Sequence, residues 1–323
     1  MAAIHKTNPS LQVTADHQIK MAEAPIEKPG YGEVLLHIKC TGICGSDIHF
    51  WKTGRIGPLI VESDCILGHE ASGVVLKLGE GVKDFVIGDR VAVEPGMPCD
   101  NCWLCREGRY NLCEDVKFSG VWPHHGTLQR FKVHAAKWLH KRTPRTPLSR
   151  PPRHPSRRTH PRSRRGNLRC WPHWPNRSPL FPRLWRTPLV ITDLEPQRLA
   201  FAKKLVPECE TYQVSRDLSS EDNAKGIRKL FGESEYGCPE TVLECTGVES
   251  SIINLKFINR YTDTWPAGIA AVKGKLMDLK PLVSHVFPLE KAVDAMHICA
   301  DLSQGSIKVQ IVDDVEIKPE DVE

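Results

Sequence analysis

The sequence predicts an α/β plus β protein, with a barrel-like β domain followed by an incomplete α/β domain. Short apolar segments separated by glycine turns occupy the first 141 residues, as in a β barrel. After residue 188 an apolar strand leads directly into a helix-forming segment, as in α/β folds. Between them, residues 142–187 fit neither class. A length of 323 residues is enough for two domains of ordinary size.

Three segments predict strands of the β domain. Residues 32–40 alternate apolar and polar side chains, and residues 70–79 and 88–93 are apolar stretches bounded by glycines. Residues 305–311, G-S-I-K-V-Q-I, are expected to form a closing strand. Many short strands of this kind favour a barrel.

Two segments predict the α/β part. Residues 189–193, L-V-I-T-D, indicate a buried parallel strand that ends in an acid, Asp193, and the residues after it favour a helix. Residues 241–247 predict another strand of the same sheet. For Asp193 two interpretations stay open: a cofactor-binding acid at a strand end, or the N-cap of the helix.

Charge is spread unevenly along the chain. The formal net charge is +5, yet residues 142–187 contain thirteen Arg and no Asp, Glu or Lys, so the remainder is mildly acidic. An apolar fraction of 40% is ordinary for a globular protein, and no run is long enough to span a bilayer. Residues 1–9 are polar and do not resemble a secretory leader, so a cytoplasmic location is expected.

A first group of metal-ligand residue types lies between residues 40 and 70. Cys44, His69 and Glu70 offer a thiolate, an imidazole and a carboxylate, which suit a catalytic zinc with one open position. Each residue alone is better explained by packing. The set gains weight because a second zinc pattern follows it.

The second pattern is a cluster of four cysteines, Cys99, Cys102, Cys105 and Cys113. Four thiolates in one loop can complete a tetrahedral shell, so this site is expected to be structural. Disulfides are the alternative, and a cytosolic location argues against them.

With these motifs the chain resembles the zinc-containing medium-chain alcohol dehydrogenases, in particular the polyol branch (sorbitol, xylitol and L-arabinitol dehydrogenases) and its fungal members. The resemblance covers residues 10–141 and 188–317 and is carried by G-I-C-G-S-D-I-H-F-W, G-H-E, G-D-R-V-A-V-E-P-G, the four-cysteine loop, V-I-T-D, E-C-T-G-V-E-S-S and N-R-Y-T-D-T-W-P. It implies a GroES-like catalytic domain, a Rossmann domain, and oxidation of a polyol to a ketose with zinc and NAD.

The resemblance also assigns roles to individual residues. It implies catalytic zinc on Cys44, His69 and Glu70 and structural zinc on the four cysteines. Ser46 and His49 would relay the hydroxyl proton to solvent; a turn residue and a surface histidine are the alternatives. The other implied roles are cofactor binding by Asp193 and Arg198 and substrate binding by Phe118, Arg260 and Tyr261.

Asp193 would hold the adenosine ribose hydroxyls and repel the phosphate of NADP, so NAD is implied. Core packing is the alternative for Phe118, and ion pairs are the alternatives for the arginines. The family is often tetrameric, so a homo-tetramer is the implied assembly. Which polyol is the substrate does not follow from these residues.

Residues 142–187 hold ten prolines and depart from the family pattern. We interpret them as a frameshifted, disordered segment. Residues 169–176, back-translated and read one base later, can spell G-A-G-P-I-G-L, a dinucleotide-binding turn. The same offset at residues 145–151 gives E-P-L-S-V-A, a family motif. A second departure lies near 253/254, where a helix and a strand of the family are missing.

The predicted organisation is therefore a catalytic domain over 1–141, an aberrant segment over 142–187, a Rossmann remnant over 188–258 and a return to the catalytic domain over 259–323. Two alternatives stay open: a zinc-binding remnant without catalysis, and a module whose arginine-rich arm binds nucleic acid. The second predicts salt-sensitive binding and is disfavoured by the acidic remainder of the chain.

Overall fold

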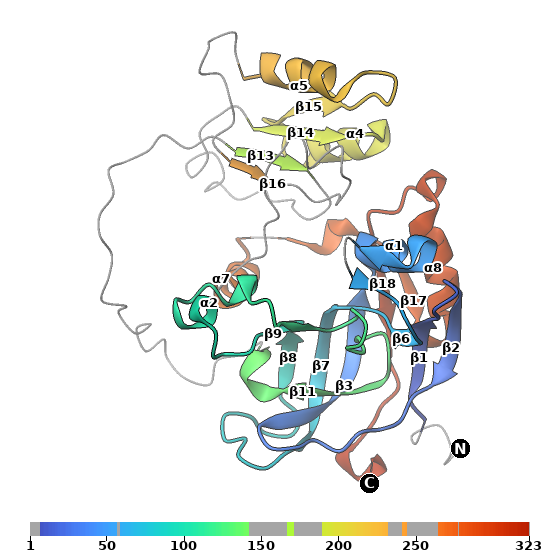
Figure 1. Ribbon diagram of the computed structural model, residues 1–323, viewed down its shortest axis with the longest axis vertical. Coiled ribbons are helices and arrows are strands. Elements are labelled where there is room, and N and C mark those ends of the chain that lie inside the picture. The colour runs from blue at the N-terminus through green and yellow to red at the C-terminus, as the bar shows by residue number, and fades with distance from the viewer. Residues whose placement is uncertain are drawn as a thin grey trace. The chain divides into compact units, whose positions relative to one another are not determined.

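The computed structural model describes residues 7–56, 59–141, 167–170, 189–231, 241–243, 264–276 and 278–322. The chain divides into two compact units (Figure 1). The first comprises Met1–Pro144, Tyr261–Ala267 and Val283–Glu323, and the second Arg145–Arg260 and Gly268–Leu282.

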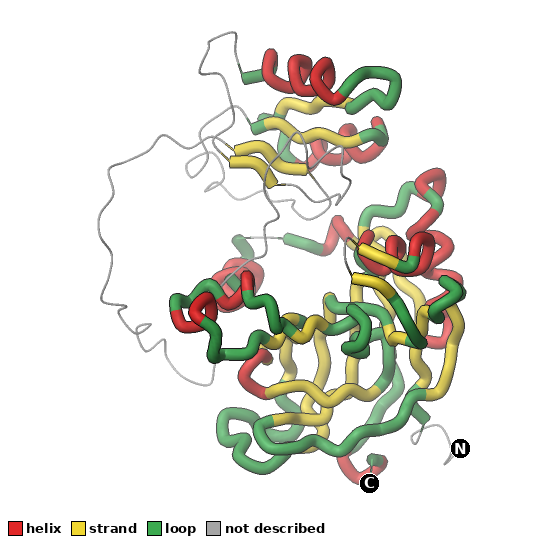
Figure 2. The backbone as a smooth tube through the Cα atoms, viewed as in Figure 1, coloured by secondary structure: helices red, strands yellow, loops and turns green. Residues whose placement is uncertain are grey.

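The first unit is mainly β structure, as the yellow segments of Figure 2 show. Its strands are β1 (Pro9–Val13), β2 (Ile19–Glu23), β3 (Glu33–Gly42), β4 (Arg55–Ile56), β5 (Leu59–Ile60), β6 (Cys65–Ile66), β7 (Glu70–Leu78), β8 (Arg90–Val93), β9 (Gly96–Met97), β10 (Lys117–Phe118), β11 (Phe131–Ala135), β12 (Leu139–Lys141), β17 (Val283–Pro288) and β18 (Lys308–Val312). The strands expected over 32–40, 70–79, 88–93 and 305–311 are confirmed.

Helices of the first unit are α1 (Gly45–Thr53), α2 (Trp103–Arg106) and α8 (Ala292–Ala300), with 3-10 turns η2 (Tyr110–Leu112), η3 (Ala136–Trp138) and η5 (Leu289–Lys291). Helix α7 (Trp265–Lys273) begins in the first unit and ends in the second.

Strand β3 is the centre of the main sheet, whose order is β12-β8-β7-β3-β18-β17, with β11 also paired to β3. Its alternating sequence is buried from Val34 to Ile38 because strands cover both of its edges. Strand β18 pairs antiparallel with β3, and β17 pairs parallel with β18. The C-terminal segment therefore completes a sheet that the N-terminal segment begins.

Helix α8 joins this C-terminal segment to α1 through an apolar core. Ala292, Ala295 and Met296 are buried in one cluster with Phe50 and Trp51. The Trp51 ring also meets the His297 ring edge-on, with 4.8 Å between centroids. Since full burial of such side chains contributes about 1.5–3 kcal/mol each, α8 stabilises the position of α1.

A buried ion pair fastens the end of β18 to the rest of the unit. The Arg130 guanidinium, 2% exposed, donates to Asp313 over 2.7 Å and to Glu290 over 2.9 Å. His37 Nε2 lies 3.2 Å from the same Asp313 carboxylate. The Asp313 carboxylate, just after β18, thus contacts His37 of β3 and Arg130 just before β11. Arg130 in turn contacts Glu290 of η5.

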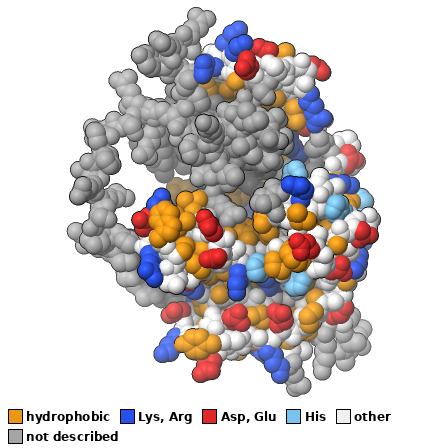
Figure 3. Space-filling model, viewed as in Figure 1, with side chains coloured by type: hydrophobic (Ala, Val, Ile, Leu, Met, Phe, Trp, Pro, Cys, Tyr) orange, Lys and Arg blue, Asp and Glu red, His pale blue; other side chains and the backbone are white. Residues whose placement is uncertain are grey.

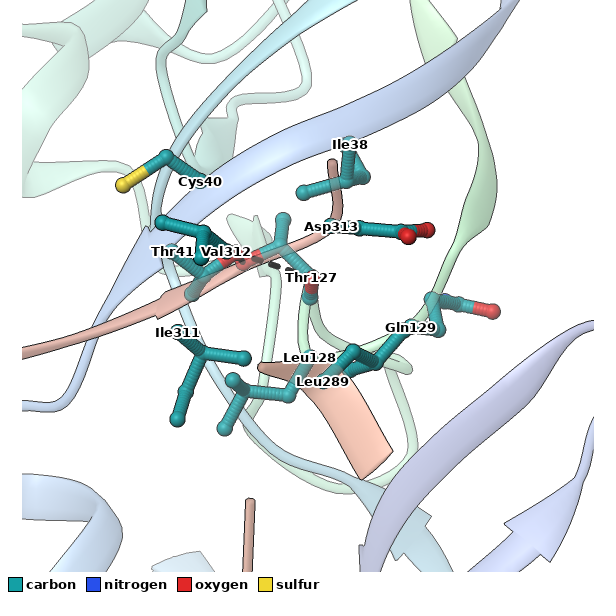
Figure 4. Close-up of a pocket in the computed structure, with 10 residues that line it drawn as sticks. All are labelled: Ile38, Cys40, Thr41, Thr127, Leu128, Gln129, Leu289, Ile311, Val312 and Asp313. Carbon is teal, nitrogen blue, oxygen red and sulfur yellow. Dashed lines mark hydrogen bonds between the residues drawn. The ribbon is translucent and has the colours of Figure 1, made fainter. Parts of the chain in front are cut away.

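Figure 4 shows a small cavity beside this ion pair. It is lined by Ile38, Cys40, Thr41, Thr127, Leu128, Gln129, Leu289, Ile311, Val312 and Asp313. Thr41 Oγ1 donates to the Thr127 carbonyl over 3.0 Å across it. Cys44, His69 and Glu70 do not line this cavity, so it belongs to the joint between β3 and β18 and not to the candidate metal site.

The second unit contains a parallel four-stranded sheet in the order β15-β14-β13-β16. Its strands are β13 (Asn167–Cys170), β14 (Val190–Asp193), β15 (Glu210–Gln213) and β16 (Thr241–Leu243), with helices α4 (Pro196–Leu205) and α5 (Ser220–Lys229). In chain order this is the 3-2-1-4 arrangement of doubly wound dinucleotide-binding folds, with its topological switch point between β13 and β16. The strand expected at 189–193 is confirmed, and the one expected at 241–247 is confirmed over 241–243, with 244–247 outside the described residues.

Strand β13 differs from the disorder expected across 142–187. Residues 167–170 pair with β14 on one side and β16 on the other, so they form an interior strand. The physical reason is local: these four residues, N-L-R-C, contain no proline and can donate every ladder hydrogen bond. The rest of 142–187 lies outside the described residues.

We predict that Asp313→Asn destabilises the protein by about 3–5 kcal/mol, because Arg130 would stay buried without its countercharge. Glu290→Gln is the matched control, and since Glu290 is 58% exposed it should cost about 1 kcal/mol or less. Urea unfolding at neutral pH measures both. Equal costs would contradict the assignment.

The pH dependence of the same pair is also predicted. Burial alone raises the pKa of Asp313, but hydrogen bonds from His37 and Arg130 outweigh burial and hold that pKa below its usual value. A depressed folded-state pKa means that the contribution is complete above the ordinary aspartate pKa of about 3.9 and is lost as the pH falls through the lower folded-state value. The Asp313→Asn deficit should therefore shrink in that acidic range, as unfolding curves at stepped pH will measure.

Candidate metal and cofactor sites

Cys44, His69 and Glu70 converge at the ends of two neighbouring elements. Cys44 is the N-cap residue of α1, and Glu70 is the first residue of β7, directly after His69. One ligand atom from each lies within 4.8 Å of the others. The sequence-based expectation that the three lie together is confirmed by this geometry, and their role as ligands stays a prediction.

The buried Asp47 carboxylate holds the two loops of this site in register. Its Oδ2 accepts the Cys44 backbone N–H over 2.8 Å, and its Oδ1 accepts the Gly68 N–H over 3.0 Å. Asp47 is fully buried, and burial raises its pKa. Asp47 therefore anchors the Cys44 loop against Gly68.

His69 has one ring nitrogen toward Asp47 and the other toward Ser46. Nδ1 lies 3.6 Å from Asp47 Oδ1 and makes no hydrogen bond within the described part of the chain. Nε2 lies 3.2 Å from Ser46 Oγ. Burial lowers the pKa of His69, but the Asp47 and Cys44 side chains outweigh burial and raise that pKa to about 9. The Asp47 carboxylate therefore favours the protonated form of this imidazole.

Sequence reasoning missed how the Glu70 carboxylate is held. Lys308 Nζ, from β18, donates to Glu70 Oε2 over 2.7 Å and to the Ile43 carbonyl over 3.1 Å. Gly42 on β3 pairs directly with Glu70, and a β-carbon on Gly42 would overlap its carboxylate. Glycine in the middle strand thus lets side chains of β7 and β18 meet across it. No sequence signal links residues so far apart.

Phe118 lies beside the His69 ring, and His49 lies on helix α1. The Phe118 ring on β10 lies 5.6 Å from the His69 ring, centroid to centroid, so it lines the site. His49 lies on α1 one turn after Ser46 and is exposed. An exposed imidazole thus lies on the same face of α1 as Ser46.

The four cysteines form a compact cluster between β9 and β10. Cys102 Sγ lies 3.4 Å from Cys105 Sγ, and the four sulfurs lie within 4.8 Å of one another, with every cysteine free. Backbone N–H groups of Asn101 and Cys102 point at Cys99 and lower its pKa to about 7. Such thiolate-stabilising amides suit a tetrahedral metal shell.

In the second unit Asp193 ends β14 and lies beside Arg198 of α4. Asp193 Oδ1 accepts the Glu195 N–H over 2.9 Å, and Oδ2 lies 4.0 Å from Arg198 Nη1. The N-cap of α4 is Glu195, so the N-cap interpretation of Asp193 is wrong. Arg260 and Tyr261 lie outside the described residues.

Comparison with protein families identifies the first unit. Residues 30–145 match the alcohol dehydrogenase GroES-like domain. The chain is 36% identical to L-arabinitol 4-dehydrogenase of Aspergillus oryzae, covering 97% of each chain, and 38% identical to the enzyme of the same name from Talaromyces emersonii, covering 87% of this chain and 85% of that one. It is 35% identical to human sorbitol dehydrogenase over 91% of this chain and 93% of that one.

Solved structures with the same fold include Escherichia coli L-idonate 5-dehydrogenase (TM-score 0.68, 18% identity, 95% of this chain and 98% of that one) and Bacillus subtilis 2R,3R-butanediol dehydrogenase (TM-score 0.66, 18% identity, 94% and 99%). At these identities the likeness concerns the fold, and it agrees with the predicted GroES-like and Rossmann architecture.

We predict that Gly42→Ala weakens Co²⁺ or Zn²⁺ binding at the Cys44 cluster by roughly 10–100-fold, because the new methyl group would displace the Glu70 carboxylate. Gly45→Ala is the matched control in the same loop, since nothing lies within 4 Å of its added methyl. Competition with a coloured chelator measures the affinity. An unchanged affinity in Gly42→Ala would show that the Glu70 position does not matter.

Proposed function

The chain belongs to the polyol branch of the zinc-containing medium-chain alcohol dehydrogenase family, and from this premise we propose that it oxidises a polyol to a ketose with NAD. The observation that carries the proposal is the convergence of Cys44, His69 and Glu70 beside Ser46 and Phe118. A thiolate, an imidazole and a carboxylate are a donor set that suits a catalytic zinc, which keeps a fourth position for water or substrate.

The donor chemistry fits zinc at both clusters. In the first, the buried His69 Nδ1 lacks a hydrogen bond within the described residues, and Asp47 is placed to orient the ring. In the second, four free thiols close a shell with no open position. Zinc bound at the first cluster would act as a Lewis acid that lowers the pKa of the substrate hydroxyl.

The residues of this chain would handle the proton that leaves the substrate hydroxyl. Ser46 Oγ lies 3.2 Å from His69 Nε2 and would accept that proton. His49, exposed on the same face of α1, would release it to solvent. Phe118 would cover the apolar side of the substrate and exclude water. Hydride transfer belongs to the nicotinamide.

The NAD preference rests on Asp193. A carboxylate at the end of the second strand in a 3-2-1-4 sheet suits the ribose hydroxyls of NAD and disfavours the phosphate of NADP. Arg198 beside it would contact the adenosine. For the substrate we propose sorbitol, xylitol or L-arabinitol, with Arg260 and Tyr261 as further polyol contacts. A homo-tetramer and a cytoplasmic location complete the proposal.

The described surface mixes positively and negatively charged side chains. On the face in Figure 3, Lys and Arg side chains of the described residues are interspersed with Asp and Glu, in contrast to a continuous basic stripe. No helix in the described part of the chain has the length and hydropathy needed to cross a bilayer.

The alignment with a relative is longer than this chain, which agrees with a segment missing from the chain. The match to the Aspergillus oryzae enzyme extends over 375 positions, whereas this chain has 323 residues, so the relative contains residues without a counterpart here. We therefore propose that the frameshift over 142–187 and the gap near 253/254 reduce cofactor binding in the 323-residue chain. Transcript sequencing across both regions tests this proposal directly, and an uninterrupted in-frame message would contradict it.

Cofactor binding provides a further test. The 323-residue chain should bind NAD weakly by calorimetry, because the glycine-rich turn is absent from its reading frame. A chain with 142–187 re-framed and the gap filled should bind NAD and reduce it with one of the three polyols. Tight NAD binding by the 323-residue chain, or a restored chain that holds zinc yet oxidises none of them, would contradict this account.

In the restored chain, Ser46→Ala should lower kcat by roughly 10²–10⁴-fold, because the proton acceptor at the cluster is lost. Thr53→Ala is the control, since its hydroxyl lies on the same helix and bonds only backbone carbonyls of His49 and Arg55. NADH absorbance measures both. Equal rates for the two variants would remove Ser46 from the mechanism.

A further inference from the structure

Glu94 is a buried carboxylate that the proposed mechanism does not use. It is 5% exposed, and both of its oxygens are engaged. Oε1 accepts the Tyr110 hydroxyl over 3.0 Å, and Oε2 lies 2.7 Å from His140 Nε2. Its backbone carbonyl accepts His134 Nε2 over 3.0 Å. A carboxylate this fully satisfied has one fixed position.

The Glu94 carboxylate is connected to the four-cysteine loop by its hydrogen bond from Tyr110. Tyr110 begins η2, three residues before Cys113, and its ring packs against Trp138 with 5.0 Å between centroids. The loop therefore meets the sheet through Tyr110. If loss of metal moved the loop, the hydrogen bond from Tyr110 would be the first Glu94 contact to change.

The main chain after Glu94 enters the strand pair β9 and β10, which contains Phe118 of the candidate catalytic site. The next residue, Pro95, accepts the Ser119 N–H over 3.0 Å. Gly96 begins β9 and pairs with Phe118 of β10, and a β-carbon added to Gly96 would lie 3.5 Å from the Phe118 ring. The Phe118 ring lies 5.6 Å from the His69 ring. One residue, Pro95, thus separates Glu94 from the strand pair that contains Phe118.

We propose that Glu94 is a positioning residue that couples the four-cysteine loop to the Phe118 wall of the candidate catalytic site. The inference rests on the proposed metal roles of the two clusters. Loss of metal from the loop would move Tyr110, release Glu94 and shift β9 with β10, so Phe118 would leave its position beside His69. The loop then controls the shape of the substrate site as well as the stability of the unit.

The test uses ¹⁹F NMR of the 323-residue chain carrying 4-fluorophenylalanine at its nine phenylalanines. The Phe118 signal is assigned by its disappearance in Phe118→Leu. In Cys105→Ser, which removes one thiol of the loop, this signal should move away from its position in the zinc-loaded parent. Tyr110→Phe keeps all four thiols and adds one new signal, from position 110. In it the Phe118 signal should move in the same direction while zinc analysis still finds metal in the loop.

Lys137→Ala is the matched control. Lys137 Nζ pairs with Asp100 of the same loop over 2.7 Å and lies 5.1 Å from the Trp138 ring centroid, but both side chains are about half exposed. The carboxylate of Glu94 bonds Tyr110 and His140 instead. Its Phe118 signal should stay at the parent position. If Tyr110→Phe lowers the melting temperature and leaves the Phe118 signal unmoved, Glu94 is a stabilising pair only and the proposal is overturned. Failure of the restored chain to oxidise any of the three polyols, with the expected ¹⁹F shifts intact, would overturn the proposed function alone.

Discussion

The buried Asp47 carboxylate is the interaction on which the candidate site depends. It accepts one N–H from the Cys44 loop and one from Gly68, and it lies beside the His69 ring. Without it, two loops that are adjacent only in the folded chain would have no fixed spacing, and their backbone donors would be buried without partners. The short motif G-I-C-G-S-D therefore specifies both a ligand and the means of placing it against G-H-E.

The second constraint is that the first unit is discontinuous in sequence. Lys308 of strand β18 donates to the Glu70 carboxylate. Asp313, just after β18, accepts a hydrogen bond from the buried Arg130. Helix α8 covers α1 from the same C-terminal segment. The loops with Cys44, His69 and Glu70 come from the N-terminal part, but Lys308 and helix α8, which pack against them, come from the C-terminal segment. Any change between residues 142 and 260 that prevents this return would disturb the site without touching a ligand.

The strands and the metal-ligand sets could be predicted from sequence because local patterns encode them. Alternation, bounding glycines and cysteine spacing are short-range signals, and β3, β7 and β14 follow them. Lys308 and the burial of Arg130 could not be predicted, since both depend on pairing between β3 and β18 across more than 200 residues. Proline content was misleading at β13, where four proline-free residues suffice for an interior strand. Asp193 shows the limit of a local rule: its carboxylate bonds the Glu195 N–H, yet Glu195 is the cap.

The central claim is that Cys44, His69 and Glu70 bind a zinc ion separate from the one in the four-cysteine loop. Metal analysis of the purified chain tests it most directly. The account predicts two zinc ions per chain, one for each cluster, with one lost in Cys44→Ser and the other retained. A purified parent chain with a single zinc ion that Cys44→Ser leaves in place would contradict it.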